Sequence, residues 1–373
     1  MTLETAAAKV KIPPARLEAW EDPDSKDRPT IRQAETLAHA YRRPFAVLFL
    51  PDIPRDFQPL QDFRRSGSKE LTTSAEFIIR EVRQKQAWIS EFNRENGEPP
   101  LAFVGRFTQN DDPAVVAQDI LKTLGIDPEV YDANRTPLRE WMAKAEATGI
   151  FISRTSFIHS SMKLDSDEFQ GFAIADPQAP FVFINTEDWD SAQLFTLVHE
   201  LAHIWIAATG ISSEIIADST ATAQLHPVER FCNAVAAHAL MPEKVMARLD
   251  ASLFTHSTSI KQIAKRYGVS SLALLIRARG RRMLTDAAFH AMRDVLDREF
   301  KEYLRSLADK EAGTKKPRSG PSHYLLQLNR NGRLFTQVVL DAFRGGSIQP
   351  TVASSLLNAP VNGFSKFEKY MYA

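Results

Sequence analysis

The stretch that decides the fold of this chain is TLVHELAHIW, from Thr196 to Trp205. It belongs to a predicted helix over residues 189–209, because apolar residues recur there at helical spacing and a glycine follows. His199 and His203 are four residues apart and therefore share one helical face, with Glu200 beside them. The motif HExxH thus predicts two imidazoles that hold one metal ion and a carboxylate that acts as a base. The alternative is an exposed helix with two unrelated histidines.

A catalytic zinc site also needs a third protein ligand and an open position for water. The best candidate is Glu229, in a second predicted helix at residues 226–240 with the sequence HPVERFCNAVAAHAL. Glu229, Cys232 and Asn233 fall on one face of that helix, which can lie against the HExxH helix. The sequence therefore predicts that two histidines and this glutamate hold one zinc ion per chain. Mn²⁺ suits the same mixed imidazole and carboxylate set.

This ligand set predicts metal-assisted hydrolysis of a peptide bond. A bound zinc ion acidifies water and polarises a carbonyl group. Glu200 then accepts the proton of the water and passes it to the leaving amine. The predicted strands GFAIAD, from Gly171, and PFVFIN, from Pro180, could offer an edge to which an extended peptide adds as a further strand.

Several other side chains are candidates for supporting roles at this site. Those that could position a ligand or the substrate are Asn233, Asn185, His226 and His238. The two histidines could also replace a metal ligand or donate to the transition state, but for both we prefer a position on the surface or behind a ligand. Asp190 and Asp218 are near enough in sequence to support a metal ligand, and the sequence does not choose between them. Cys232 fits a small buried hydrophobic residue better than a ligand or a nucleophile.

Composition excludes several classes of protein. Basic and acidic residues number 46 each, so no net field draws the whole molecule to nucleic acid or to an anionic membrane. The single cysteine excludes an internal disulfide framework and a cysteine-based zinc finger, and it fits a reducing compartment. The first residues lack the apolar core of a secretory signal, and the longest apolar run, Phe45–Leu50, is too short to span a bilayer. We expect a cytoplasmic protein.

The chemically specific motifs resemble those of the ImmA/IrrE family of bacterial and phage metallopeptidases. The resemblance is carried by HELAH from His199, by ERFCN and AAHALMP about two dozen residues later, and by NTEDW upstream. It implies His199, His203 and Glu229 as zinc ligands and Glu200 as general base. Cys232 stands where the family usually has alanine, and both residues are small.

The first fifty-odd residues resemble the helix-turn-helix of the XRE family, which is similar to phage repressors. The segments that carry this resemblance are LETAAAKVKIPPARLEAWE, PTIRQAETLAHAY and RRPFAVLFLPDIP. The family normally has another helix before this point. The positive charge of Arg16 is offset by nearby acidic residues, so a small packing or dimerisation domain is an equal alternative to DNA binding.

A basic run lies between Asp250 and Asp286, where the chain has no acidic residue. The candidates for contact with nucleic acid in this run are Lys261, Lys265, Arg266, Arg277, Arg279, Arg281 and Arg282. The pattern around them is typical of a winged or helix-turn-helix unit. The alternative, which we prefer, is a solvated helical face that packs on the catalytic domain.

The whole pattern predicts an α+β fold that is mainly helical. It consists of a zincin-like metallopeptidase core with a small mixed sheet, flanked by helix-turn-helix-like helical domains. The predicted divisions are an XRE-like unit at 1–56, a connecting helix at 57–100, the metallopeptidase domain at 101–245, a helical domain at 246–308, a linker at 309–322 and a helical tail at 323–373.

Two functions compete at this stage. The family resemblance implies a zinc metalloendopeptidase that cuts a regulatory protein, such as a helix-turn-helix repressor, in a stress, phage or toxin-antitoxin response. The alternative is an XRE-type DNA-binding regulator or antitoxin whose zincin domain senses metal or a partner without cutting. A zinc site that serves structure alone is disfavoured, because Glu200 would have no role in it.

Overall fold

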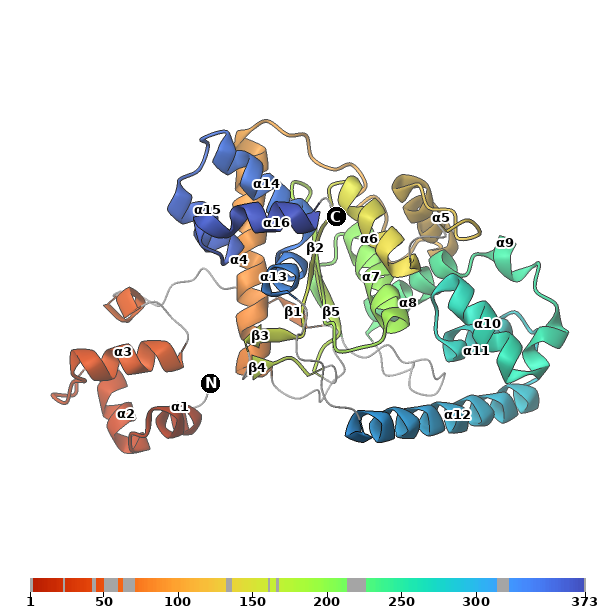
Figure 1. Cartoon of the computed structure of the whole chain (residues 1–373), viewed down its shortest axis with the longest axis horizontal. Helices are drawn as coiled ribbons and strands as arrows, with labels where there is room; N and C mark the ends of the chain where they lie inside the picture. Colours follow the sequence, from red (N-terminus) through yellow and green to blue (C-terminus); the bar gives the residue numbers. More distant parts are fainter. Residues whose placement is uncertain are drawn as a thin grey trace. The chain divides into compact units, whose positions relative to one another are not determined.

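The structure is a computed structural model of the chain (Figure 1). It describes residues 3–22, 24–41, 45–49, 60–62, 71–131, 136–159, 162–165, 168–212, 226–313 and 322–371. The chain divides into two compact units, Met1–Pro59 with Leu71–Arg80 and Leu60–Glu70 with Glu81–Ala373. The finer division into six segments stays a prediction.

The first unit contains three short helices, α1 (Leu3–Val10), α2 (Pro14–Glu21) and α3 (Ile31–Ala40), as the sequence predicts. A short 3-10 helix, η1 (Phe45–Phe49), follows them. A proline occupies the first turn of α2, and Thr30 with Gln33 forms a capping box at the start of α3. The helices pack through a small core of Ala6, Ala7, Leu17 and Leu37. The rest of RRPFAVLFLPDIP lies outside the described residues, and DNA binding by this unit stays a prediction.

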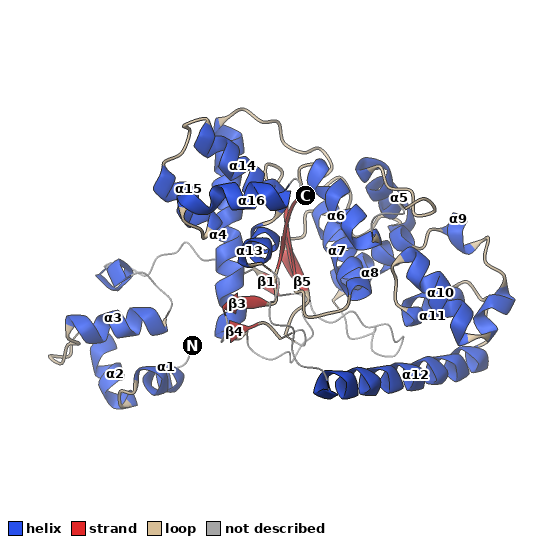
Figure 2. Ribbon diagram, viewed as in Figure 1, coloured by secondary structure: helices blue, strands red, loops and turns tan. Residues whose placement is uncertain are grey.

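The second unit is built on a mixed sheet of short strands (Figure 2). Its strands are β1 (Gln61–Asp62), β2 (Phe151–Arg154), β5 (Gly171–Ile174), β6 (Phe181–Ile184) and β7 (Gly210–Ser212), in the order β1-β7-β5-β6-β2. The strands β2 and β6 are parallel, whereas β5 is antiparallel to both of its neighbours. The strands β3 (Phe157–His159) and β4 (Met162–Lys163) pair antiparallel in a separate two-stranded sheet. The predicted mainly helical α+β fold with a small mixed sheet is confirmed.

The strands β5 and β6 are interior strands, so the prediction that they offer a free edge to a peptide is wrong. Strand β5 lies between β7 and β6, and β6 lies between β5 and β2. All residues of β5 and β6 are buried, because helices cover the apolar side chains that point to both faces. The sequence did not indicate β7, a short strand that begins just after the HExxH helix and occupies the edge of β5.

Helices cover the sheet on the side of the HExxH motif. Helix α7 (Asp190–Trp205) packs against β5 and β6, and α8 (Pro227–Leu240) packs against α7 and α5 (Pro113–Leu124). Helix α6 (Pro137–Ala147) contacts α7 and β2. The later helices are α9 (Glu243–Met246), α10 (Ser257–Tyr267), α11 (Ser271–Gly280) and α12 (Asp286–Gly313), with the 3-10 helix η3 (Ala251–Thr255) between α9 and α10.

The helices after residue 246 share one hydrophobic core with the predicted metallopeptidase domain. Ile260 of α10, Leu274 of α11 and Phe289 of α12 belong to the same buried cluster as Leu197 of α7. Helix α12 continues to Gly313, into the first part of the predicted linker, because Asp309–Ala312 are residues that a helix accommodates well. The remainder of that linker, up to residue 321, lies outside the described residues.

The C-terminal helices pack at the edge of the sheet that β2 forms. They are α13 (His323–Asn331), α14 (Arg333–Arg344), α15 (Pro350–Leu357) and α16 (Phe364–Met371), with the 3-10 helix η4 (Val361–Gly363) before α16. Helices α13 and α14 contact β2. The turn between them has Gly332 at φ +87°, and a Cβ there would overlap the carbonyl oxygen of Ile152 in β2. Only glycine fits this close approach.

A buried ionic network joins this C-terminal part to α4 (Thr73–Glu95). Lys85 donates to Glu81 Oε1 and to Asn331 Oδ1, each at 2.8 Å, and Arg330 also pairs with Glu81. Burial disfavours the charged form of Glu81, but Lys85 and Arg330 outweigh burial and lower the pKa of that carboxyl to about 2. The network therefore depends on an ionised Glu81.

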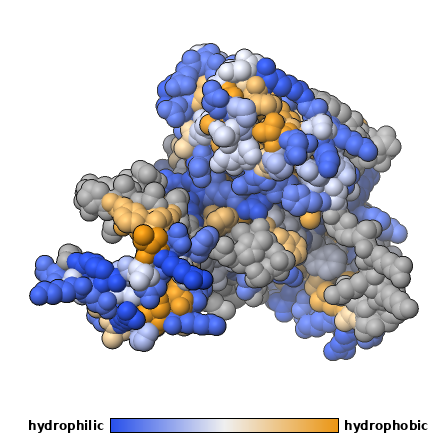
Figure 3. All heavy atoms as spheres, turned by 60° about the vertical axis from the view of Figure 1, so that its left-hand side comes forward, coloured by the Kyte–Doolittle hydropathy of each residue, from blue (hydrophilic) through white to orange (hydrophobic). Residues whose placement is uncertain are grey.

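The described surface is mainly hydrophilic on the face drawn in Figure 3, with smaller hydrophobic areas among the polar residues. Among the described helices, none is long and apolar enough to cross a membrane.

Candidate metal centre

The two histidines of the motif lie on the buried side of α7. Leu194, Leu197, Val198 and Leu201 surround them and are fully buried, so the helix is held against the sheet and α8 by apolar contacts. His199 is 2% exposed and His203 is 0% exposed. Their Nε2 atoms are 3.1 Å apart, since residues four apart on a helix stack on one face. This pair of converging nitrogens is the first part of the site.

Glu229 completes the group from the first turn of α8. Its Oε2 lies 3.2 Å from His199 Nε2 and its Oε1 lies 3.1 Å from His203 Nε2. Among the described residues, these three form the one group of histidine, cysteine and acidic side chains with the spacing of metal ligands. An ion with tetrahedral bonds of about 2.05 Å holds its ligand atoms about 3.3 Å apart. The observed distances match that value to within about 0.2 Å, so the three side chains fit zinc.

The second nitrogen of His199 is held by Asn233. His199 Nδ1 lies 2.9 Å from Asn233 Oδ1, and this carbonyl oxygen can only accept a hydrogen bond. The proton of a neutral imidazole is therefore on Nδ1, and Nε2 presents a lone pair to the centre of the site. Asn233 lies one helical turn after Glu229 on α8, so a single helix provides one ligand and orients another.

Burial and the charges of their neighbours shift the pKa values of all three side chains in the group. Burial disfavours the charged form of His199, yet the neighbouring Glu229 carboxylate outweighs burial and raises the pKa of this imidazole. Burial lowers the pKa of His203. Burial likewise opposes ionisation of Glu229, but the two imidazoles lower its pKa to about 2. The carboxyl group of Glu229 is therefore ionised at neutral pH.

Glu200 is also fully buried and lies against strand β5. An ideal Cβ placed on Gly171 would be 3.1 Å from Glu200 Oε1, 2.7 Å from Thr196 Cγ2 and 2.8 Å from the carbonyl oxygen of Phe183. The absence of a side chain at Gly171 therefore lets the strand approach the carboxylate of the predicted base. Sequence reasoning missed this residue, although an isolated glycine inside a strand pattern indicates a close backbone approach.

Comparison with known proteins agrees with this geometry. Residues 145–279 match the family model of the IrrE N-terminal-like domain, Peptidase_M78. This segment is similar to a metallopeptidase domain. A search of curated proteins finds no match to the chain. The IrrE N-terminal-like segment contains all three grouped side chains and Glu200, and it supports the resemblance to the ImmA/IrrE family for this part of the chain.

The other predicted site residues of the IrrE N-terminal-like segment are not members of the group of three side chains. Asn185 is buried at the end of β6, where its amide donates to Phe169 O and accepts from the backbone of Glu187. His226 caps α8, because its Nδ1 accepts from the amide of Val228. His238 is half-buried near Arg277, whose guanidinium lies 2.9 Å from its Nδ1, and burial lowers its pKa.

Cys232 and Asp190 can also be placed in the structure. Cys232 is fully buried in the core and burial raises the pKa of its thiol, so the prediction of a small buried hydrophobic residue is confirmed. Asp190 is the first residue of α7, more than two helical turns before His199. Asp218 lies outside the described residues.

Acidic residues from outside the basic run pair with several of its members. Lys261 contacts Glu299 at 2.7 Å, Arg279 contacts Asp286 at 2.8 Å, and Arg281 pairs with Glu243. Arg277 donates to the carbonyl oxygen of Met241 at the end of α8, Arg266 lies over the ring of Tyr267, and Arg282 has a positive φ of 58°. Lys265 lies exposed beside a groove that also contains Lys261. Contact with nucleic acid stays a prediction for these residues.

Proposed function

We propose that this chain is a zinc-dependent metalloendopeptidase that hydrolyses a peptide bond in a regulatory protein. The observation that carries this proposal is the group of three buried ligand atoms, 3.1 to 3.2 Å apart, with the carboxylate of Glu200 on the same helix. The similarity of residues 145–279 to a peptidase family supports the same reading. A structural zinc site would not need a buried glutamate beside its ligands.

His199, His203 and Glu229 would hold the ion and leave a fourth position open. When bound, zinc supplies Lewis acidity, which lowers the pKa of a water molecule to about 7 and polarises a carbonyl group. Asn233 keeps the ring of His199 oriented through its hydrogen bond of 2.9 Å. The buried apolar residues of α7 keep bulk water away and strengthen the electrostatic interactions of the site.

Glu200 would move the proton during the reaction. Its carboxylate accepts a proton from the attacking water and then transfers it to the nitrogen of the leaving amine. Because Gly171 has no side chain, the carboxylate of Glu200 can lie close to β5. No strand edge is free beside this point in the described sheet, because β7 pairs with β5 from Gly171 to Ala173.

The proposed substrate is a helix-turn-helix repressor or a related regulator in a stress, phage or toxin-antitoxin response. The resemblance of HELAH, ERFCN and AAHALMP to the ImmA/IrrE family supports this class of substrate. We further propose that the protein acts in the cytoplasm, since its single cysteine is buried and free.

Metal content and cleavage test the proposal together. The wild-type chain, Glu229→Ala and Glu200→Gln would be analysed for bound metal and incubated with helix-turn-helix repressors encoded near the gene. Glu187→Gln, at an exposed glutamate before α7, is the matched control. We expect about one zinc per wild-type chain, loss of metal in Glu229→Ala, and retained metal without cleavage in Glu200→Gln.

The results also separate the peptidase from a sensor. If Glu200→Gln cuts or regulates as the wild type does, Glu200 is not the base and a regulator that senses metal becomes the better description. If the wild type contains no metal, or Glu229→Ala retains it, the ligand set is wrong.

A further inference from the structure

Helix α12 carries an apolar stripe that is buried in its first half and uncovered in its second half. Phe289 and Leu296 are 3% and 7% exposed, because α10, α11 and η3 pack against them. The stripe continues at helical spacing with Phe300 and Tyr303, which are 48% and 49% exposed. Leu304 extends it at 41%. Helix α12 thus continues past the elements that cover its apolar face.

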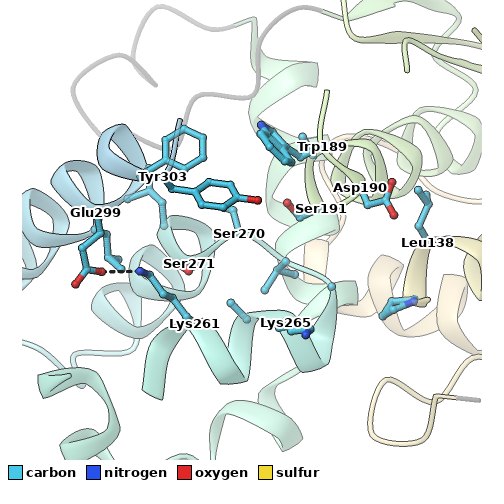
Figure 4. Close-up of a pocket in the computed structure, with 18 of the residues that line it drawn as sticks. Leu138, Trp189, Asp190, Ser191, Lys261, Lys265, Ser270, Ser271, Glu299 and Tyr303 are labelled. Atoms are coloured by element: carbon cyan, nitrogen blue, oxygen red, sulfur yellow. Dashed lines mark ion pairs between the residues drawn. The ribbon is translucent and has the colours of Figure 1, made fainter. Parts of the chain in front are cut away.

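One further aromatic residue belongs to the uncovered surface. Trp189, just before α7, is 50% exposed, and its ring centroid lies 6.4 Å from that of Phe300 and 6.1 Å from that of Tyr303. Half-exposed aromatic side chains that touch one another are typical of the centre of a protein interface. Figure 4 shows Trp189, which precedes α7, and Tyr303 of α12 facing each other.

These aromatic residues border a groove of about 1040 Å³ between α12, the α10–α11 turn and the starts of α6 and α7. Its charged lining residues are balanced, three basic and three acidic: Lys261, Lys265, Arg293, Asp190, Asp297 and Glu299. The ion pair between Lys261 and Glu299 cancels one charge of each sign (Figure 4). A lining without net charge does not select a polyanion such as nucleic acid.

We propose that α12 packs antiparallel against α12 of a second copy of this chain, about a two-fold axis. A two-fold interface requires a surface that fits itself, and here one chain contains both the apolar ridge of α12 and the groove beside it. A lining of one sign would repel its copy, whereas this lining does not. Each copy covers Phe300, Tyr303 and Trp189 of the other.

The order of charged residues along α12 favours an antiparallel arrangement of the two copies of this helix. Asp297 and Lys301 lie one turn apart on the same flank of the stripe. An antiparallel copy that crosses near residue 299 places each Asp297 beside Lys301 of the other chain. In a parallel copy this flank would face the opposite flank of the partner helix, so Asp297 and Lys301 would not meet, which disfavours that arrangement.

Sedimentation of the full chain over a wide range of concentration tests the proposal. We expect a concentration-dependent shift from 41.9 kDa to twice that mass. Phe300→Glu, and separately Tyr303→Lys, should raise the dimer dissociation constant by at least about tenfold. Val115→Glu is the matched control, since Val115 is a 51% exposed apolar residue on α5, outside the groove. A wild-type chain that stays at 41.9 kDa overturns the proposal, as does a dimer that both groove variants leave intact.

Exchanging the charges at positions 297 and 301 tests the antiparallel orientation of the two α12 helices. The test uses two variants and their mixture, so it does not depend on how well any single variant folds. Asp297→Lys and Lys301→Asp should each weaken dimerisation roughly three- to tenfold, because each variant alone places like charges in contact. An equal mixture of the two should regain dimers, since each of the two contacts between positions 297 and 301 then joins one lysine to one aspartate. If each variant is weakened and the mixture regains nothing, the antiparallel pairing is wrong.

Discussion

Replacing Gly171 by alanine should disturb the sheet beside Glu200. The added Cβ would lie 2.7 Å from Thr196 Cγ2 and 2.8 Å from the carbonyl oxygen of Phe183. Ordinary contacts of this kind are about 3.5 Å, so the overlaps amount to roughly 0.7 Å. The Phe183 carbonyl belongs to the neighbouring strand β6 and cannot rotate away as a side chain could.

The expected cost follows from this overlap. Overpacking a tight interior by one methyl group costs about 1–3 kcal/mol, and a contact with strand backbone places Gly171→Ala near about 2 kcal/mol. For a unit of about 300 residues, that loss lowers the melting temperature by roughly 3 °C. The same Cβ would lie 3.1 Å from Glu200 Oε1 and would displace this carboxylate, which should lower the cleavage rate about 10- to 100-fold.

Thermal unfolding, metal content and cleavage would be measured on the same preparation. We expect retained metal, because Gly171 does not touch a ligand atom. Gly280→Ala is the control, since no atom lies within 4 Å of its added Cβ, and in a helix alanine is favoured by about 0.5–1 kcal/mol. Equal stability of Gly171→Ala and wild type would refute the packing argument. Lower stability with unchanged cleavage would show that the strand does not position Glu200.

Three further perturbations test other parts of the structure. Asn233→Ala should weaken metal affinity about 10- to 100-fold by releasing the ring of His199, measured by competition with a chelator; unchanged affinity would contradict the orienting role. Gly332→Ala should destabilise the chain by about 3 kcal/mol, since it combines a positive φ with an overlap; a urea midpoint like that of the wild type would argue against the close approach. Glu81 has a folded pKa of about 2 against 4.5 as its ordinary value, so its contribution is complete above pH 4.5 and is lost as the pH falls toward 2. Urea unfolding of the wild type, but not of Glu81→Gln, should lose about 3 kcal/mol across that range.

The pairing of the two histidines could be predicted because its geometry is local, whereas Glu229 was expected from the need for a third ligand and from the resemblance to the ImmA/IrrE family. A spacing of four residues determines that His199 and His203 share a face, and the same rule places Asn233 one turn after Glu229. The strands β5 and β6 were also evident from their apolar runs between turn residues.

What could not be predicted depends on partners that are distant in sequence. The order of strands follows from packing between elements, so nothing in a short segment such as β7 indicates that it pairs with β5. The basic run gave no sign that Glu243 and Glu299, outside its limits, would pair with Arg281 and Lys261. The sequence shows a glycine at position 171, but it does not show that Thr196, Phe183 and Glu200 lie beside it.

The packing of α13 and α14 on β2 has a practical consequence for anyone who expresses part of this protein. A fragment cut at residues 145–279, where similarity to the peptidase family is found, would lose the helices that cover β2 and would leave that strand edge open to pairing with other chains. It would also lose α5, which packs against both α7 and α8. The segment recognised by sequence is therefore smaller than the segment that can fold, and soluble material for study should begin before α4 and include α16.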